Sequence, residues 1–84
     1  GRLMDSVRKL EEFISLFPQD AEAHTQLGLT LREFGDEEGA LAHLIEAVRL
    51  DPDRVELLGN VIQDLKERRS RKSGTEGFTL NGSP

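Results

Sequence analysis

The feature that most constrains this chain is the spacing of its apolar residues between positions 21 and 54. In the first half of this segment they recur every three or four residues, which is the period of one face of an α-helix. Gly35 and Asp36 interrupt the pattern, and a second stripe with the same period follows and stops before the turn at Pro52. The segment therefore predicts a helix, a tight turn and a second helix. The first stripe is Ala23, Leu27, Leu31 and Phe34, and the second is Ala40, Leu41, Leu44, Ile45, Ala47 and Val48.

The same period predicts one more helix on each side of this segment. The helix before it ends at Pro18, because proline cannot continue a helix. Pro18 and Pro52 lie 34 residues apart, and a shift by that length superposes the first helix on the third and the second on the fourth. The outer apolar positions are Leu3, Met4, Val7, Leu10, Phe13, Ile14 and Phe17 in the first helix and Val55, Leu58, Val61, Ile62 and Leu65 in the fourth. The four helices are expected at about residues 3–17, 21–34, 37–50 and 54–69.

Gly28 lies inside the second predicted helix, where glycine costs roughly 1 kcal/mol relative to alanine. A close approach of two helix backbones would explain its presence. A 34-residue pair of helices with such a glycine resembles the tetratricopeptide repeat, whose pattern runs W-x2-L-G-x2-Y, then A-x3-F, then P. The matching residues here are His24, Leu27, Gly28, Leu31, Ala40, Leu44 and Pro52. The resemblance implies that Gly28 packs against Ala40.

The resemblance also implies an all-α, antiparallel helix-turn-helix solenoid over residues 1–69. One full repeat at 21–54 would be flanked by a half repeat on each side. Ile62 replaces the glycine in the last half repeat, so we expect the fourth helix to cap the C-terminal end of a longer array. Residues 70–84 are rich in Gly, Ser and charge and cannot bury enough apolar surface to offset the cost of ordering, so we expect a disordered tail there.

Candidates for catalysis or metal binding are weak. The two histidines, His24 and His43, belong to no His-x-x-x-His or Glu-x-x-His pair, and both are more simply packed side chains at or beside an apolar stripe. The chain has no cysteine, no G-x-S-x-G nucleophile turn and no phosphate-binding glycine loop. We therefore expect no enzyme activity, no catalytic residue, no metal and no cofactor.

The resemblance implies that the chain binds a protein or peptide. In that family the first helix of each repeat lines a concave groove for an extended peptide or a partner helix. By position, the groove residues are Glu22, Thr25, Gln26, Leu29, Arg32 and Glu33 on the second helix and Glu56, Gly59, Asn60, Gln63, Lys66 and Glu67 on the fourth. Leu29 lies off the main stripe, so it either contacts a ligand or flanks a neighbouring helix. A carboxylate clamp is not expected, because among the corresponding residues only Asn60 fits one.

Two further readings remain open. The first helix would leave an apolar face uncovered where an upstream helix would pack, which makes Leu3, Val7 and Leu10 candidates for self-association into a homo-oligomer. The basic run from Lys66 to Lys72 either complements the dipole of the fourth helix or serves as a contact with an acidic surface, a nuclear-import-like patch, or a basophilic kinase site at Ser70 or Ser73.

Charge and hydropathy argue against two classes of partner. Sixteen acidic and eleven basic side chains give a net charge of −5, which repels nucleic acid phosphates. No apolar run reaches the roughly 18 residues of a membrane span, and no apolar leader is present. We expect no nucleic-acid or membrane partner and a cytoplasmic location. Because the chain begins at Gly1, we also expect a fragment of a longer protein.

Overall fold

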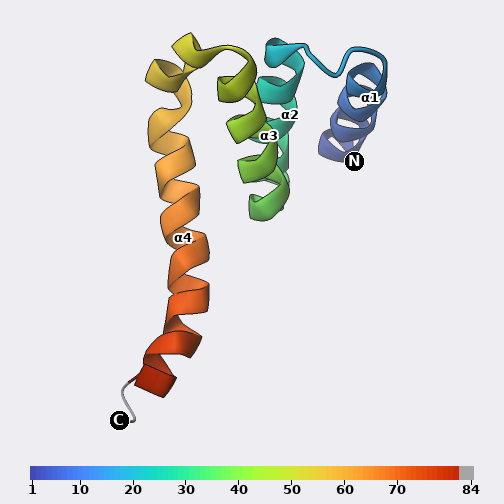
Figure 1. The fold of residues 1–84 in the computed structure, drawn as a ribbon. Coiled ribbons are helices and arrows are strands. Elements are labelled where there is room, and N and C mark those ends of the chain that lie inside the picture. Colours follow the sequence, from blue (N-terminus) through green and yellow to red (C-terminus); the bar gives the residue numbers. More distant parts are fainter. Residues whose placement is uncertain (82–84) are drawn as a thin grey trace.

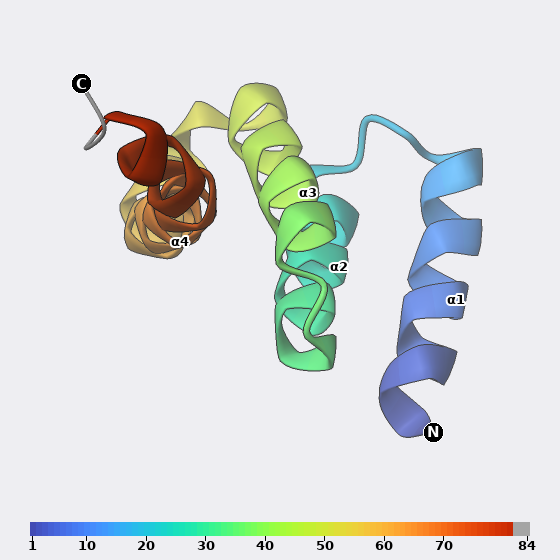
Figure 2. The same ribbon diagram turned by 90° about the horizontal axis from the view of Figure 1, so that it is seen from below.

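The computed structural model describes residues 1–81, with side chains described through residue 70, and this part of the chain contains four α-helices and no strand. Figures 1 and 2 show α1 at one edge of the molecule and α4 at the other, with α2 and α3 between them. The predicted all-α fold with four helices is confirmed. The helices are α1 (Arg2–Leu16), α2 (Ala21–Phe34), α3 (Glu37–Leu50) and α4 (Val55–Asn81), and a short 3-10 turn, η1 (Pro52–Arg54), precedes α4.

Side-chain caps and one glycine set the boundaries of the two central helices. The Asp20 carboxylate accepts a hydrogen bond from the backbone N–H of Ala23 at 2.9 Å, and Asp36 accepts one from Gly39 at 2.9 Å. Each satisfies an amide of the first helical turn that has no partner within the helix. Gly35 ends α2 with a φ of 104°, a left-handed conformation that glycine adopts without a steric penalty.

The fourth helix is longer than the sequence predicts. It was expected to end near residue 69, but the backbone of α4 continues to Asn81. Up to the predicted end, Lys, Glu and Arg residues favour helix, and Arg68 pairs with Asp64 one turn earlier at 3.5 Å, but the Gly and Ser content of residues 70–81 does not explain the further extension. The predicted disordered tail spans residues 70–84. The side chains after residue 70 are not among those described, and residues 82–84 lie outside the described residues altogether.

The tightest approach between helices surrounds Gly28. A Cβ atom at this position would lie 2.7 Å from Cγ and Cδ2 of Leu44 and 3.2 Å from the carbonyl oxygen of Ala40. Gly28, Ala40 and Leu44 are all buried. The expected contact between Gly28 and Ala40 is therefore confirmed, with the Leu44 side chain as the nearest neighbour.

Each helix packs on the next helix along the chain. The contacts join α1 to α2, α2 to α3, and α3 to α4, while no Cα pair of α2 and α4 lies within 8 Å over the described residues. These contacts bury one continuous core, which comprises Val7, Leu27, Leu31, Ala40, Leu41, Leu44, Ala47, Leu58 and Leu65. Within the described part of the chain, no helix combines the length and the apolar character that crossing a bilayer requires.

The outer helices are covered on fewer sides than the central pair. Ala23 of α2 is buried, whereas Leu57, its equivalent 34 residues later in α4, is 70% exposed. The difference follows from the packing order, because α2 has α1 and α3 as neighbours, whereas α4, within the described part of the chain, packs only on α3 and η1. Phe34 and Ile45, at the edges of the predicted apolar stripes, are also exposed.

Two glycine-to-alanine substitutions test whether Gly28 is required for packing. We expect Gly28→Ala to lower the free energy of unfolding by about 1 kcal/mol, because overpacking typically costs about 1 to 3 kcal/mol and outweighs the gain in helix propensity. Gly59→Ala is the matched control, since a Cβ there meets only Val55 Cγ2 at 3.7 Å, and it should stabilise the chain. Urea unfolding measures both, and a stabilised Gly28→Ala variant would contradict the close contact.

Candidate functional site

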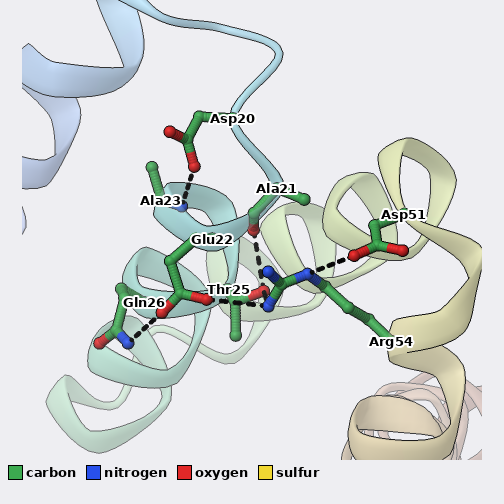
Figure 3. A network of polar contacts seen from close by, with 8 residues as sticks. All are labelled: Asp20, Ala21, Glu22, Ala23, Thr25, Gln26, Asp51 and Arg54. Atoms are coloured by element: carbon green, nitrogen blue, oxygen red, sulfur yellow. Dashed lines mark hydrogen bonds and ion pairs between the residues drawn. The ribbon is translucent and has the colours of Figure 1, made fainter.

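Arg54 joins η1 to the first turns of α2 in the polar network shown in Figure 3. Its Nη1 donates to Glu22 Oε1 at 3.0 Å and to Thr25 Oγ1 at 3.2 Å. Its Nε donates to Asp51 Oδ2 at 3.2 Å. The guanidinium thus binds two carboxylates and one hydroxyl at once, and it ties the turn after α3 back to the start of α2.

Glu22 displays a fixed negative charge at the surface of α2. Gln26 Nε2 donates to the second carboxylate oxygen of Glu22 at 2.8 Å, one helical turn further on. The hydrogen bond from Gln26 and the ion pair with Arg54 lower the pKa of the Glu22 carboxyl. The side chains of Glu22 and Gln26 remain exposed, so their free hydrogen-bonding positions are open to a ligand.

Most of the predicted groove residues are exposed, but Thr25, Leu29 and the partly buried Gly59 are not. Thr25 is only 3% exposed because its hydroxyl donates to Ala21 O at 2.9 Å and its oxygen accepts from Arg54. Leu29 is partly buried against the core, which agrees with the reading that it flanks a neighbouring helix. The exposed ones are Glu22, Gln26, Arg32, Glu33, Glu56, Asn60, Gln63, Lys66 and Glu67. They form one set on α2 and another on α4, two helices that are not packed against each other.

The two histidines meet between α2 and α3. His24 Nδ1 lies 3.0 Å from His43 Nδ1, and the rings are stacked with centroids 5.2 Å apart. His24 Nε2 lies 2.9 Å from Pro18 O. A carbonyl oxygen accepts, so Nε2 of His24 carries the proton, and in the neutral pair His43 Nδ1 donates to His24 Nδ1. The pair therefore connects the loop before α2 to the middle of α3.

This arrangement favours a neutral His43. Burial, followed by the proximity of His24, lowers the pKa of His43, while the carboxylates of Glu11 on α1 and of Asp36 and Glu46 on the α3 side act in the opposite direction. If both rings were protonated, two N–H groups would face each other across the Nδ1–Nδ1 contact and the hydrogen bond would be lost. Over the described residues, no group of three or more His, Cys, Asp or Glu side chains could hold a metal ion.

The apolar surface of α1 differs from the predicted self-association face. Val7 was expected to be exposed, but it is buried in the core, because it lies on the side that packs on the rest of the bundle, and Leu10 is partly buried at the edge of that side. The apolar side chains that α1 and the residue after it expose are Leu3, Phe13, Leu16 and Phe17. The rings of Phe13 and Phe17 pack with centroids 4.9 Å apart.

Sequence reasoning missed three features of this surface. The role of Arg54 was not predicted, although an arginine three residues after Asp51 was a possible signal. The contact between the histidines follows from the register that Gly28 and Ala40 define. His24 lies about one turn before Gly28 in α2, and His43 lies about one turn after Ala40 in α3. In the basic run, Arg68 is engaged with Glu37 of α3 at 2.6 Å.

A pair of arginine substitutions tests the link between η1 and α2. We expect Arg54→Ala to lower the free energy of unfolding by about 1 kcal/mol, because it removes hydrogen bonds to a buried threonine and to partly exposed carboxylates. Arg49→Ala is the control, because Arg49 is exposed and pairs only with Glu46 inside α3 among the described residues. Equal urea midpoints for the two variants would mean that the Arg54 network adds no stability.

The histidine pair predicts how stability depends on pH. The folded-state pKa of His43 is below the ordinary value of 6.5, so protonation favours the unfolded chain. The stability contributed by neutral His43 is complete above that ordinary value and is lost as the pH falls below it towards the folded-state pKa. Urea unfolding between about pH 8 and pH 5 should show this decline. His43→Gln keeps a donor for His24 without titrating, so its decline should be shallower, and an unchanged slope would contradict the assignment.

Comparison of this chain with protein-family models, with curated proteins and with solved structures finds no match. The resemblance to the tetratricopeptide repeat therefore remains a proposal that depends on the residues and on the packing described above.

Proposed function

We propose that this chain is a non-catalytic protein-interaction module of the tetratricopeptide kind, which binds an extended peptide or a partner helix along the exposed polar surface of α2 and α4. One observation carries the proposal. The pair formed by Glu22 and Gln26 is exposed, hydrogen-bonded within itself and held by Arg54. A ligand therefore meets groups that are already ordered, which reduces the entropy lost on binding.

The chemistry of this surface favours a basic ligand, because its four carboxylates outnumber its two cations, Arg32 and Lys66. Glu22, Gln26, Leu29 and Glu33 follow one another at helical spacing along α2, so carboxylates stand near both ends of the row. On α4, Glu56, Asn60 and Gln63 follow the same spacing and add one more carboxylate and two amides. A peptide with Lys or Arg side chains and free backbone groups would match this pattern of charge and hydrogen bonding.

Selection from a random peptide display library tests the proposal without assuming a partner. The full chain should enrich peptides that carry Lys or Arg, and the affinity of the best peptide should fall with added salt. Glu33→Lys reverses a charge on the α2 row and should weaken that peptide at least tenfold, about 1.4 kcal/mol. Glu38→Lys changes an exposed charge on α3 and should have little effect. A library that yields no basic peptide, or equal losses in the two variants, would count against this surface.

A second candidate function is self-association through α1. The observation that favours it is the exposed apolar set Leu3, Phe13, Leu16 and Phe17 at one edge of the molecule. Contiguous exposed apolar side chains commonly mark a protein interface. This candidate uses neither α2 nor α4, so the two functions are compatible and are tested separately.

A further inference from the structure

We propose that α1 of one copy pairs antiparallel with α1 of a second copy across a two-fold axis near Leu10. This inference rests on self-association through α1, which it deepens by naming the partner and the register. It is independent of the peptide surface on α2 and α4.

The 34-residue shift identifies which side of α1 lacks a partner. In α3, Ala40, Leu44 and Ala47 lie on the side that meets α2, and all three are fully buried. Their equivalents in α1 are Ser6, Leu10 and Phe13, of which Ser6 is exposed, Leu10 is partly buried and Phe13 is 42% exposed. By contrast, Val7 of α1 and its equivalent in α3, Leu41, are both buried. The side of α1 that contains Ser6 and Phe13 is therefore the one that a further helix would cover.

The sizes of the residues on that side suit a second copy of α1 in the antiparallel direction. With the axis between positions 9 and 10, so that Leu10 packs beside Leu10 of the second copy, the small Ser6 lies opposite the large Phe13, and Leu3 lies opposite Leu16. The contact between the Phe13 and Phe17 rings means that this apolar ridge is already formed in the single chain. Parallel pairing would instead place Phe13 against Phe13 and Ser6 against Ser6, which crowds one level and leaves a void at another.

Charge and shape favour the same direction. Lys9 and Glu12 are exposed on α1, and antiparallel pairing places Lys9 of each copy within about one turn of Glu12 of the other, which offsets the proximity of the two Lys9 side chains near the axis. Such exposed pairs select orientation more than they add affinity. An open hollow of about 420 Å³, lined by Leu16, Phe17, Pro18, Gln19 and Asp20, lies at the end of α1. In the antiparallel register it is next to Leu3 of the second copy.

The interface would be small. Fifteen residues of α1 span about 22 Å at 1.5 Å per residue, and one pair of helices of this length buries less than the roughly 1,200 Å² of a standard interface. We therefore expect a dimer that forms at high protein concentration and dissociates on dilution.

Cysteine cross-linking tests the register directly, because the chain has no cysteine of its own. A mixture of Ser6→Cys and Phe13→Cys chains should form a disulfide-linked dimer under mild oxidation faster than Ser6→Cys alone, which keeps both Phe13 rings. Leu57→Cys, at an exposed apolar position on α4, is the control and should not cross-link with Ser6→Cys. Preferred linkage of Ser6→Cys to itself, or linkage to Leu57→Cys, would overturn the antiparallel pairing.

Sedimentation of the full chain separates this inference from self-association itself. Wild-type protein should shift from monomer to dimer with concentration, Phe13→Ser should weaken the dimer at least tenfold, and Leu57→Ser should not. Lys9→Glu and Glu12→Lys should each weaken the dimer, and mixing them should restore it, because both ion pairs then have opposite charges. If a dimer forms but is insensitive to Phe13→Ser or shows the wrong cross-links, self-association stands and the antiparallel pairing of α1 is overturned. A chain that stays monomeric at every concentration overturns both.

Discussion

The contact of Gly28 with Ala40 and Leu44 is the interaction on which the arrangement of the other residues depends. Because no side chain separates the two backbones there, α2 and α3 approach closely at one level, and that level fixes which residues face each other elsewhere along the pair. About one turn away, the same register brings His24 against His43. On the other side of Gly28, Gly35 and Asp36 form the turn that lets α3 run back along α2.

The polar contacts at the opposite end of this pair depend on that register too. Arg54 reaches Glu22 and Thr25 because α3 returns the chain to the level at which α2 began. The chain between Pro18 and Asp20 is held at the same level by His24 and by the Asp20 cap. Backbone proximity at one point thus organises a hydrogen-bonded end of the molecule, where the exposed Glu22 and Gln26 lie.

Much of the fold could be predicted from the sequence because its signals are local. Apolar period, the prolines and the capping aspartates define α2 and α3 within the chain itself, and the observed bounds of both agree with the prediction. The end of α4 could not be placed in this way, because the Gly, Ser and charged residues after position 69 indicate a tail, whereas the backbone is helical to Asn81. The candidate site was predicted less well. Period alone shows that Thr25 lies off the apolar stripe, but not that Arg54 would cover it.

The apolar face of α1 shows the same limit. Its residues form a wide stripe, and the stripe does not reveal which side meets α2 and which side has no neighbour. Burial of Val7 and exposure of Phe13 decide the matter, and both depend on where a different helix lies. Comparison of α1 with α3 through the 34-residue shift is what separates the two sides.

The neighbour-to-neighbour order of the helices has a consequence for how the chain opens. Since each helix touches only the next over the residues that the structure describes, most contacts are short in sequence and little loop-closure entropy opposes folding. Either outer helix can detach without disturbing the contacts of the other. Backbone amides in α1 and α4 then exchange with solvent through partial opening, and those of the α2–α3 hairpin exchange only when the last cooperative unit unfolds.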